Sequence, residues 1–347
     1  MTGVKSRQLN NKTVLTWLVC LFLVAFSIGL LYLWIMRTPA KPESSLQQVI
    51  IATNTEYVGT CSITAAREKG YFAKEGIVVL IQSHSSGKAA MDAVLQGQAN
   101  LGTVADIPVM FAGLDQRPVS VIATIFKTEK DHGIVGRRDR GVLTPADLKG
   151  KRVGVTLSTS SHFTLSAFLN RQKLSVKDVT VINYKPEEFA DAIDRGEVDA
   201  VASWEPFLNT MMTRLGSNGV VFYGKDVYES LYNVVGMRSY IAEQPETIRK
   251  VLRALDQGSQ YCNDMPDAAR VIHEAGKKTD TKEQRAAWAT YRFEIVLDQG
   301  LLLALEDQAR WAIKNKLTNK TEVPNYLDYV YLDGMEKIKP SAVTIIH

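Results

Sequence analysis

An internal repeat constrains the fold of this 347-residue chain more than any other feature of its sequence. The segment Asp191–Phe207 predicts the end of a helix, a glycine turn, a short buried strand and a polar loop. The same order of residue types occurs 99 positions earlier, so that Gly97 corresponds to Gly196 and Asp106 to Glu205. A repeated strand–helix–strand unit predicts two similar α/β lobes, although two amphipathic helices can also resemble each other by chance.

The N-terminus carries a long apolar segment. Thr13–Met36 comprises 24 residues without a charged side chain, and a helix of that length rises roughly 36 Å, enough to cross a hydrocarbon core. It predicts an uncleaved transmembrane anchor, with a removed signal peptide as the alternative. Basic residues on both sides favour a cytoplasmic segment 1–12 and an inner-membrane anchor, with the folded body in the periplasm or outside the cell. Residues 37–47, which contain two Pro and two Ser, form the predicted linker.

The repeat and the strand pattern divide the body into three parts. Residues 48–138 are predicted to form the first part of lobe 1, and residues 139–231 form lobe 2. Residues 232–347 return to lobe 1 and continue as C-terminal helices. Two connections between the lobes, near Arg137–Val142 and Tyr223–Tyr232, are the predicted hinge.

The spacing of the cysteines and the distribution of charge argue against a metal or redox site and against a nucleic-acid partner. Cys20, Cys61 and Cys262 have no metal-binding or redox spacing, and Cys20 lies in the apolar segment. Cys61 and Cys262 could form a disulfide in an oxidising compartment, but two small buried thiols are the favoured interpretation. The 41 Lys and Arg are scattered among 37 Asp and Glu, so no basic patch indicates a nucleic-acid partner.

Polar loops that follow the predicted strands form the candidate ligand site, because open α/β sheets bind ligands beyond the carboxyl ends of their strands. The hydroxyl-rich turn Ser158–His162 opens a helix, where free N–H groups and the helix dipole attract anions, with capping alone as the alternative. Trp204 is predicted to be an aromatic wall, or else a core residue. Glu205 is predicted to pair with the cation of a zwitterion, or else to begin the next helix. The full predicted set is Asn54, Thr55, Ser85, Ser86, Thr103, Asp106, Ser158, Thr159, Ser160, Ser161, His162, Trp204 and Glu205.

Several short motifs occur together in one order between Val49 and Met237. They are Ala66–Phe72, Ser86-Gly87 followed by Leu95–Gly97, Asp147–Lys151, Gly154-Val155 with Ser160–His162, and Gly196–Ala200 with Trp204–Pro206. In this combination the chain resembles the periplasmic substrate-binding proteins of ABC importers for nitrate, aliphatic sulfonates, taurine and pyrimidine precursors. The resemblance implies two hinged lobes that close over a small ligand. By motif position it places six side chains at the cleft: Asn54, Ser86, Asp106, Ser160, His162 and Trp204.

The function that follows is capture of a small oxyanion or zwitterion, of the taurine, aliphatic sulfonate or nitrate type, for ABC permease subunits. We expect a membrane-tethered monomer without cofactor, metal or catalytic residues. A sensory ectodomain and a pyrimidine-precursor binder are the alternatives. An enzyme is disfavoured because the five His form no metal pair at helical spacing and no Ser or Cys lies in an elbow motif. The chain also lacks the cysteine-rich motif of the related pyrimidine-synthesising enzymes, and it departs from the soluble pattern in its long apolar segment.

Overall fold

The computed structural model describes residues 17, 22–32, 47–224, 227–273, 288 and 291–347. The chain forms two compact units, Met1–Ser45 and Leu46–His347. In the first unit residues 22–32 are helical, and the predicted anchor Thr13–Met36 lies partly outside the described residues. No helix among the described residues is both long enough and apolar enough to cross a membrane.

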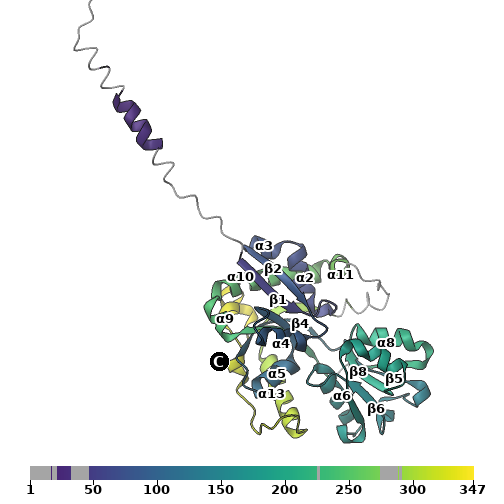
Figure 1. Ribbon diagram of the computed structural model, residues 1–347. Coiled ribbons are helices and arrows are strands. Elements are labelled where there is room, and N and C mark those ends of the chain that lie inside the picture. The colour runs from purple at the N-terminus through teal and green to yellow at the C-terminus, as the bar shows by residue number, and fades with distance from the viewer. Residues whose placement is uncertain (1–16, 18–21, 33–46, 225–226, 274–287, 289–290) are drawn as a thin grey trace, which may run out of the picture. The chain divides into compact units, whose positions relative to one another are not determined.

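The second unit consists of two lobes, each built on one mixed sheet and covered by helices (Figure 1). The first sheet has the order β11-β4-β10-β3-β1-β2 and the second β7-β6-β8-β5-β9. Both lobes therefore have three parallel strands, β2-β1-β3 or β7-β6-β8, followed by an antiparallel neighbour. The strands are β1 Gln47–Thr53, β2 Ile77–Ser83, β3 Leu101–Ala105, β4 Val119–Thr128, β5 His132–Arg137, β6 Arg152–Val155, β7 Thr180–Asn183, β8 Ala200–Trp204, β9 Gly219–Tyr223, β10 Ser230–Met237 and β11 Arg292–Val296.

The repeat predicted from the sequence is confirmed as β2–α4–β3 in lobe 1 and β7–α7–β8 in lobe 2. Gly97 and Gly196 end the two helices with φ of +72° and +71°, a conformation that costs glycine little. In both copies the next residue donates its N–H to the carbonyl five positions earlier. Asn100 and Asp199 then each accept a backbone N–H from the middle of the three parallel strands of their own lobe, β1 or β6, at 2.8 and 2.9 Å. The matching residues thus have the same structural role in the two lobes.

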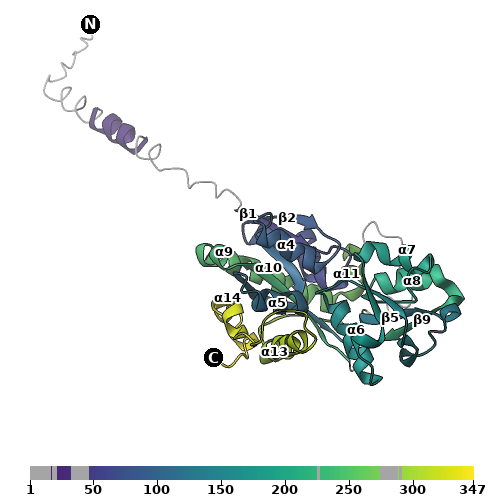
Figure 2. The same cartoon turned by 60° about the horizontal axis from the view of Figure 1, so that its bottom comes forward.

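Two segments connect the lobes, and one of them differs from the prediction. β5 pairs with β8 and β9, so it belongs to lobe 2 rather than to lobe 1. The first connection is therefore 129–131, between β4 and β5, and the predicted crossing at Arg137–Val142 is wrong. The second, 224–229, lies within the predicted Tyr223–Tyr232. Figure 2 shows lobe 2, which carries β5, β9, α6, α7 and α8, beside lobe 1.

The favoured interpretation of two free thiols is also wrong, because Cys61 and Cys262 form a disulfide with their Cα atoms 6.3 Å apart. The disulfide joins α2 (Cys61–Glu68) to α10 (Pro245–Asp264). These helices pack closely because Gly258 has no Cβ, which would lie only 2.1 Å from the Ser62 carbonyl oxygen. The hydroxyls of Ser62 and Ser259 are 2.8 Å apart in the same interface.

Further helices complete both lobes. Helix α5 begins at Asp106, with Ala105 as its N-cap, although Asp106 is the residue type that usually caps a helix. The α-helices beyond α2 and α10 are α3 Tyr71–Lys74, α4 Gly87–Leu95, α5 Asp106–Leu114, α6 Ser160–Arg171, α7 Phe189–Asp194, α8 Phe207–Leu215, α9 Arg238–Glu243, α11 Pro266–His273, α13 Gln299–Lys314 and α14 Asp333–Ile338. Short 3-10 turns are η1 Val58–Thr60, η2 Arg138–Arg140, η3 Pro145–Leu148, η4 Val176–Asp178, η5 Pro186–Glu188, η6 Gly216–Asn218, η7 Tyr326–Tyr329 and η8 Pro340–Ala342.

Candidate ligand-binding site

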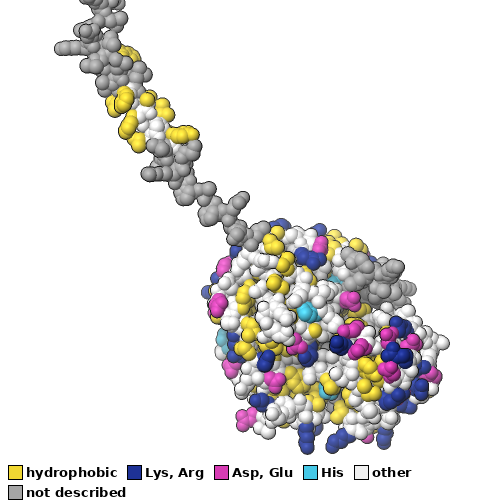
Figure 3. Space-filling view, viewed as in Figure 1, with side chains coloured by type: hydrophobic (Ala, Val, Ile, Leu, Met, Phe, Trp, Pro, Cys, Tyr) yellow, Lys and Arg dark blue, Asp and Glu magenta, His cyan; other side chains and the backbone are white. Residues whose placement is uncertain are grey.

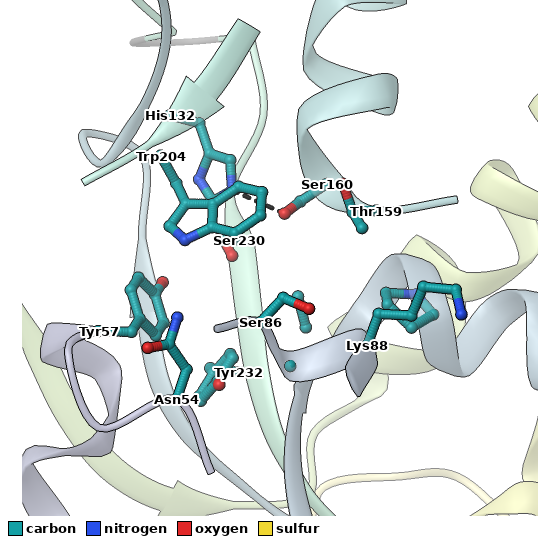
Figure 4. A pocket seen from close by; sticks show the side chains of 13 residues that line it. Asn54, Tyr57, Ser86, Lys88, His132, Thr159, Ser160, Trp204, Ser230 and Tyr232 are labelled. Carbon is teal, nitrogen blue, oxygen red and sulfur yellow. Dashed lines mark hydrogen bonds between the residues drawn. The ribbon is translucent and has the colours of Figure 1, made fainter. Parts of the chain in front are cut away.

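A small cavity of about 30 Å³ lies where the two lobes meet (Figure 4). A single water needs roughly 10–15 Å³, so the cavity fits a compact chemical group. Lobe 1 contributes Asn54, Tyr57, Ser86, Gly87, Lys88, Ala105, Pro108, Ser230 and Tyr232, and lobe 2 contributes His132, Thr159, Ser160 and Trp204. Among these lining residues there is no Asp or Glu, whereas Lys88 and His132 supply basic groups.

The lobe 1 wall is built around the start of α4. Ser86 is the N-cap of that helix, and its hydroxyl accepts the N–H of Ala89 at 3.2 Å. Gly87 lets the helix approach β3, because a Cβ there would come within 2.9 Å of the Val104 Cα. Lys88 also lines the cavity, but its ammonium group points away from the other lining residues and pairs with Asp92 at 2.7 Å (Figure 4). The wall thus combines a hydroxyl with a helix N-terminus, both of which favour an anion.

The opposite wall is the start of α6. Thr159 is its N-cap residue, and the Thr159 hydroxyl donates to the Thr156 carbonyl at 2.7 Å. The Ser161 hydroxyl accepts the backbone N–H of Thr156 at 3.2 Å. These bonds close the turn before the helix, while Thr159 and Ser160 line the cavity. The hydroxyl-rich turn is therefore closed by its own hydrogen bonds, and two of its residues line the cavity.

Ser160 ends a chain of hydrogen bonds that begins at a buried carboxylate. Nδ1 of His132 lies 2.6 Å from Oδ1 of Asp131, and its Nε2 lies 2.8 Å from Oγ of Ser160 (Figure 4). Tyr57 donates its hydroxyl to the other oxygen of Asp131. Asp131 is completely buried, and His132 is 3% exposed. His132 is therefore hydrogen-bonded on one side to a buried carboxylate and on the other to the serine hydroxyl that lines the cavity.

Aromatic rings form the remaining surface. Trp204, at the end of β8, is 6% exposed and stands opposite His132 in the strand register, with ring centroids 6.3 Å apart. On its other side it contacts Phe207 at 5.7 Å, edge to face. Tyr57 and Tyr232 are stacked edge to face at 4.6 Å on the lobe 1 side. Trp204 is thus both packed and part of the cavity wall.

Sequence comparison identifies the family to which these residues belong. Residues 59–269 match the model of the family described as NMT1/THI5-like. The chain is a member of this family. A protein of Bacillus subtilis (strain 168) named for binding aliphatic sulfonates is 24% identical over 278 residues, which cover 77% of this chain and 82% of that protein. The taurine-binding periplasmic protein of Escherichia coli (strain K12) is 27% identical over 147 residues, or 42% of this chain and 45% of that protein.

Solved structures show the same fold. The alkanesulfonate-binding protein SsuA from Xanthomonas axonopodis pv. citri, bound to MOPS, superposes with a TM-score of 0.72 at 20% identity, covering 82% of this chain and 98% of that one. The periplasmic nitrate-binding protein NrtA from Synechocystis PCC 6803 gives a TM-score of 0.67 at 10% identity, covering 85% and 89%. These structures show the two-lobe periplasmic-binding-protein fold for this chain.

Within this NMT1/THI5-like chain the structure brings together five of the predicted site residues, namely Asn54, Ser86, Thr159, Ser160 and Trp204. Eight others do not line the cavity. Ser85 is exposed, Thr55 bonds to Ser83, and Thr103 is buried beneath the cavity, bonded to Thr53. The remaining five are Asp106, Ser158, Ser161, His162 and Glu205.

The two acids of the repeat are held inside the protein rather than at the cavity. Asp106 accepts hydrogen bonds from Tyr228 and Gln308. Burial raises its pKa to about 6, although both of these bonds act to lower it. Glu205 accepts the N–H of Asn209 at 3.1 Å and the hydroxyl of Tyr223 at 2.6 Å. Asp106 therefore forms tertiary hydrogen bonds, whereas Glu205 accepts an N–H from the first turn of α8, which agrees with the alternative interpretation of Glu205.

His162 faces lobe 1 rather than the cavity. Its ring contacts Trp311 of α13 edge to face at 5.4 Å, and the neighbouring Phe163 contacts the same ring at 5.1 Å. Burial lowers the pKa of His162 to about 4, so the imidazole is neutral near pH 7. This pair of aromatic contacts joins the lobes beside the cavity.

Several residues at the site were not predicted from the sequence. They are Tyr57, Lys88, His132, Ser230 and Tyr232. His132 and Ser230 directly follow the two connections between lobes, and residues next to a hinge necessarily lie near the cleft that it closes. Correct placement of the first connection would therefore have indicated His132. Within the described residues no group of three or more His, Cys, Asp or Glu is arranged to hold a metal ion.

Replacing Trp204 with Ala is expected to weaken binding of the ligand at least tenfold, about 1.4 kcal/mol, because the indole forms one wall of the cavity. Calorimetric titration of both proteins measures this change. Thermal unfolding of the ligand-free variant is the control, since Trp204 also packs against Phe207. A large loss of stability with unchanged affinity would assign the residue to the core alone.

Proposed function

We propose that this protein is the substrate-binding component of an ABC importer, which captures a small oxyanion between its lobes and delivers it to a membrane permease. The observation that carries the proposal is the composition of the cavity. Both lobes direct hydroxyl or amide groups and a helix N-terminus at it, and its lining includes two basic side chains without an acidic one. Relatives named for binding sulfonates and taurine support the same ligand class.

The position of Glu205 distinguishes between two kinds of ligand, a simple oxyanion and a zwitterion. A zwitterion such as taurine would need a carboxylate in the cavity to pair with its ammonium group. The Glu205 carboxylate instead accepts bonds from Asn209 and Tyr223. The cavity therefore favours a simple oxyanion, of the alkyl sulfonate or nitrate type, over an aminosulfonate.

Replacing Glu205 with Gln is accordingly expected to leave the affinities for taurine and for ethanesulfonate unchanged to within about twofold, well under the 1.4 kcal/mol of a tenfold effect. Calorimetry with both ligands on the wild type and the variant measures this. If the variant lost affinity for taurine but not for ethanesulfonate, this result would support the zwitterion hypothesis instead.

Closure of the lobes supplies the mechanism of capture. The connections at 129–131 and 224–229 are the two segments about which the lobes can rotate. Ser86 lies on one lobe and Ser160 on the other, so a ligand that contacts both stabilises the closed state by its differential affinity. A permease that recognises the closed lobes then receives only loaded protein.

Titration of the full chain with ethanesulfonate, nitrate and ethylammonium tests the proposal. We expect saturable one-to-one binding of at least one of the two anions and no binding of the cation, which resembles ethanesulfonate in size but has the opposite charge. Binding of ethylammonium alone, or of none of the three, would overturn the proposal.

The uncharged run Thr13–Met36 motivates a second element of the proposal, that the protein is tethered to the inner membrane with its body in the periplasm or outside the cell. Fractionation of cells that express the full chain tests this. Retention of the protein in membranes washed with alkaline carbonate is the expected result, and release into the wash would contradict it.

A further inference from the structure

The chain of hydrogen bonds Asp131–His132–Ser160 determines which atom Ser160 presents to a ligand. An ionised carboxylate only accepts, so Nδ1 of His132 carries the proton shared with Asp131 at 2.6 Å. A neutral imidazole then has an unprotonated Nε2, which accepts the hydroxyl proton of Ser160 across 2.8 Å. In that state the oxygen of Ser160 directs lone pairs at the cavity, and these repel an anion.

Protonation of His132 reverses the direction of this bond. Nε2 then carries an N–H that donates to Oγ of Ser160, and the serine proton is free to point into the cavity. A hydrogen bond from that hydroxyl to an oxyanion is charge-assisted and short. The imidazolium also places a positive charge behind Ser160, so that the serine lies between this charge and the ligand.

We propose that the protein takes up one proton on His132 together with its oxyanion, so that Ser160 changes from acceptor to donor when the ligand binds. The inference rests on the proposed function, since it requires an anion in this cavity. It makes His132 a positioning residue, which acts on the ligand through the serine hydroxyl.

Titratable groups face His132 from several elements. Asp131 bonds to it directly, and the interaction of His132 with Asp106 of α5 offsets part of the rise that burial causes in the pKa of Asp106. The ring of Tyr228, from the second connection, contacts the imidazole at 5.2 Å and donates its hydroxyl to Asp106. On the β8 and β9 side, Glu205 is paired with Tyr223 and interacts electrostatically with Asp131. Among the described residues, Asp131 and Asp106 are thus the carboxyl groups that interact with His132.

The nearest cation belongs to the opposite wall. Lys88 also lines the cavity, and it is paired with Asp92 at 2.7 Å. Binding of an anion adds negative charge near His132, which favours the imidazolium. Proton uptake and anion binding are therefore coupled, and each increases the affinity for the other.

Titration calorimetry of the full chain with ethanesulfonate tests the inference, because a sulfonate stays ionised across the range and contributes no proton of its own. The apparent enthalpy is measured in buffers of different ionisation enthalpy at a series of pH values. We expect uptake that approaches one proton where free His132 is neutral, with the affinity falling about tenfold per pH unit there. His132→Gln retains a side-chain amide that can donate to Ser160, so it should bind without proton uptake and with an affinity that no longer depends on pH.

His84→Gln is the matched control. His84 lies in the loop after β2, outside the cavity lining, and this variant should keep the proton uptake of the wild type. Imidazole NMR of the wild type, with and without ethanesulfonate, gives the same answer without a variant, since only the protonated ring carries both N–H groups. Binding without proton uptake, or uptake that persists in His132→Gln, would overturn this inference and leave the proposed function intact. If neither ethanesulfonate nor nitrate binds at any pH, both proposals fail.

Discussion

Removal of the Cys61–Cys262 disulfide is expected to lower the free energy of unfolding by about 2–5 kcal/mol, near the upper end of that range. The disulfide closes a loop between residues separated by 201 positions, and the chain entropy that it removes from the unfolded state grows with loop length. It also joins α2 and α10, which pack at close distance through Gly258.

Chemical denaturation of the full chain with and without reductant measures this effect, and Cys61→Ala/Cys262→Ala checks it without reductant. Cys20→Ala is the matched control, because it removes a cysteine and leaves the disulfide in place. Identical unfolding midpoints for oxidised and reduced protein would contradict the prediction. A disulfide of this kind persists in oxidising compartments, which agrees with relatives named as periplasmic.

Replacing Asp106 with Asn is expected to change how stability depends on pH. The carboxyl is completely buried, and its pKa is raised from 3.8 to about 6. An acid with a raised folded-state pKa contributes stability below its unfolded pKa, and this contribution is lost as the pH rises through the folded pKa. Asn cannot ionise, so the stability of the variant relative to the wild type should rise by roughly 3 kcal/mol from about pH 4 to pH 8.

Denaturant unfolding at a series of pH values measures the difference between the two proteins, in which the titration of groups that do not interact with Asp106 cancels. Tyr228 can still donate to the Asn oxygen, so the fold should tolerate the change. Asp307→Asn, with 79% of its side chain exposed, is the control for loss of a surface charge. If the difference in unfolding free energy between the two proteins did not change with pH, the folded protein would not raise the pKa of Asp106.

The repeat made much of the fold predictable from sequence. Gly97 and Gly196 mark helix ends that require a left-handed residue, and this local requirement is visible in the residue type itself. Asn100 and Asp199 each accept a backbone N–H from the middle parallel strand of their lobe. Features of this kind depend on residues close together in sequence, so periodicity and residue type reveal them.

The boundary between lobes was harder to predict because β4 and β5 are separated by only residues 129–131. Two apolar strands with so short a polar break resemble one hairpin within a single sheet. The repeat would have located β5 correctly, since β5 stands beside β8 as β10 stands beside β3. The disulfide was missed for a related reason, because helix packing across 201 positions leaves no local signal.

The candidate site was predictable in part. Ser86, Ser160 and Trp204 follow strands or begin helices, where ligands bind in open α/β folds. His132 and Tyr57 reach the cavity through a buried carboxylate on the first connection, a tertiary arrangement that spacing cannot show. On the face drawn in Figure 3, acidic and basic side chains are interspersed over the second lobe, as the mixed charges of the sequence predicted. The specific electrostatics of the site therefore come from a few buried groups rather than from the surface.

The central claim is that one oxyanion is held jointly by both lobes, and affinities of four serine variants test it most directly. Ser86→Ala and Ser160→Ala each remove one hydroxyl from the cavity, on opposite lobes, while Ser85→Ala and Ser158→Ala alter neighbours outside its lining. We predict that each of the first two lowers the affinity for ethanesulfonate about tenfold or more, the 1.5–3 kcal/mol typical of a hydrogen bond to a charged group. The two neighbouring variants should bind as the wild type does. Loss of affinity from one lobe alone, or from neither, would contradict the account.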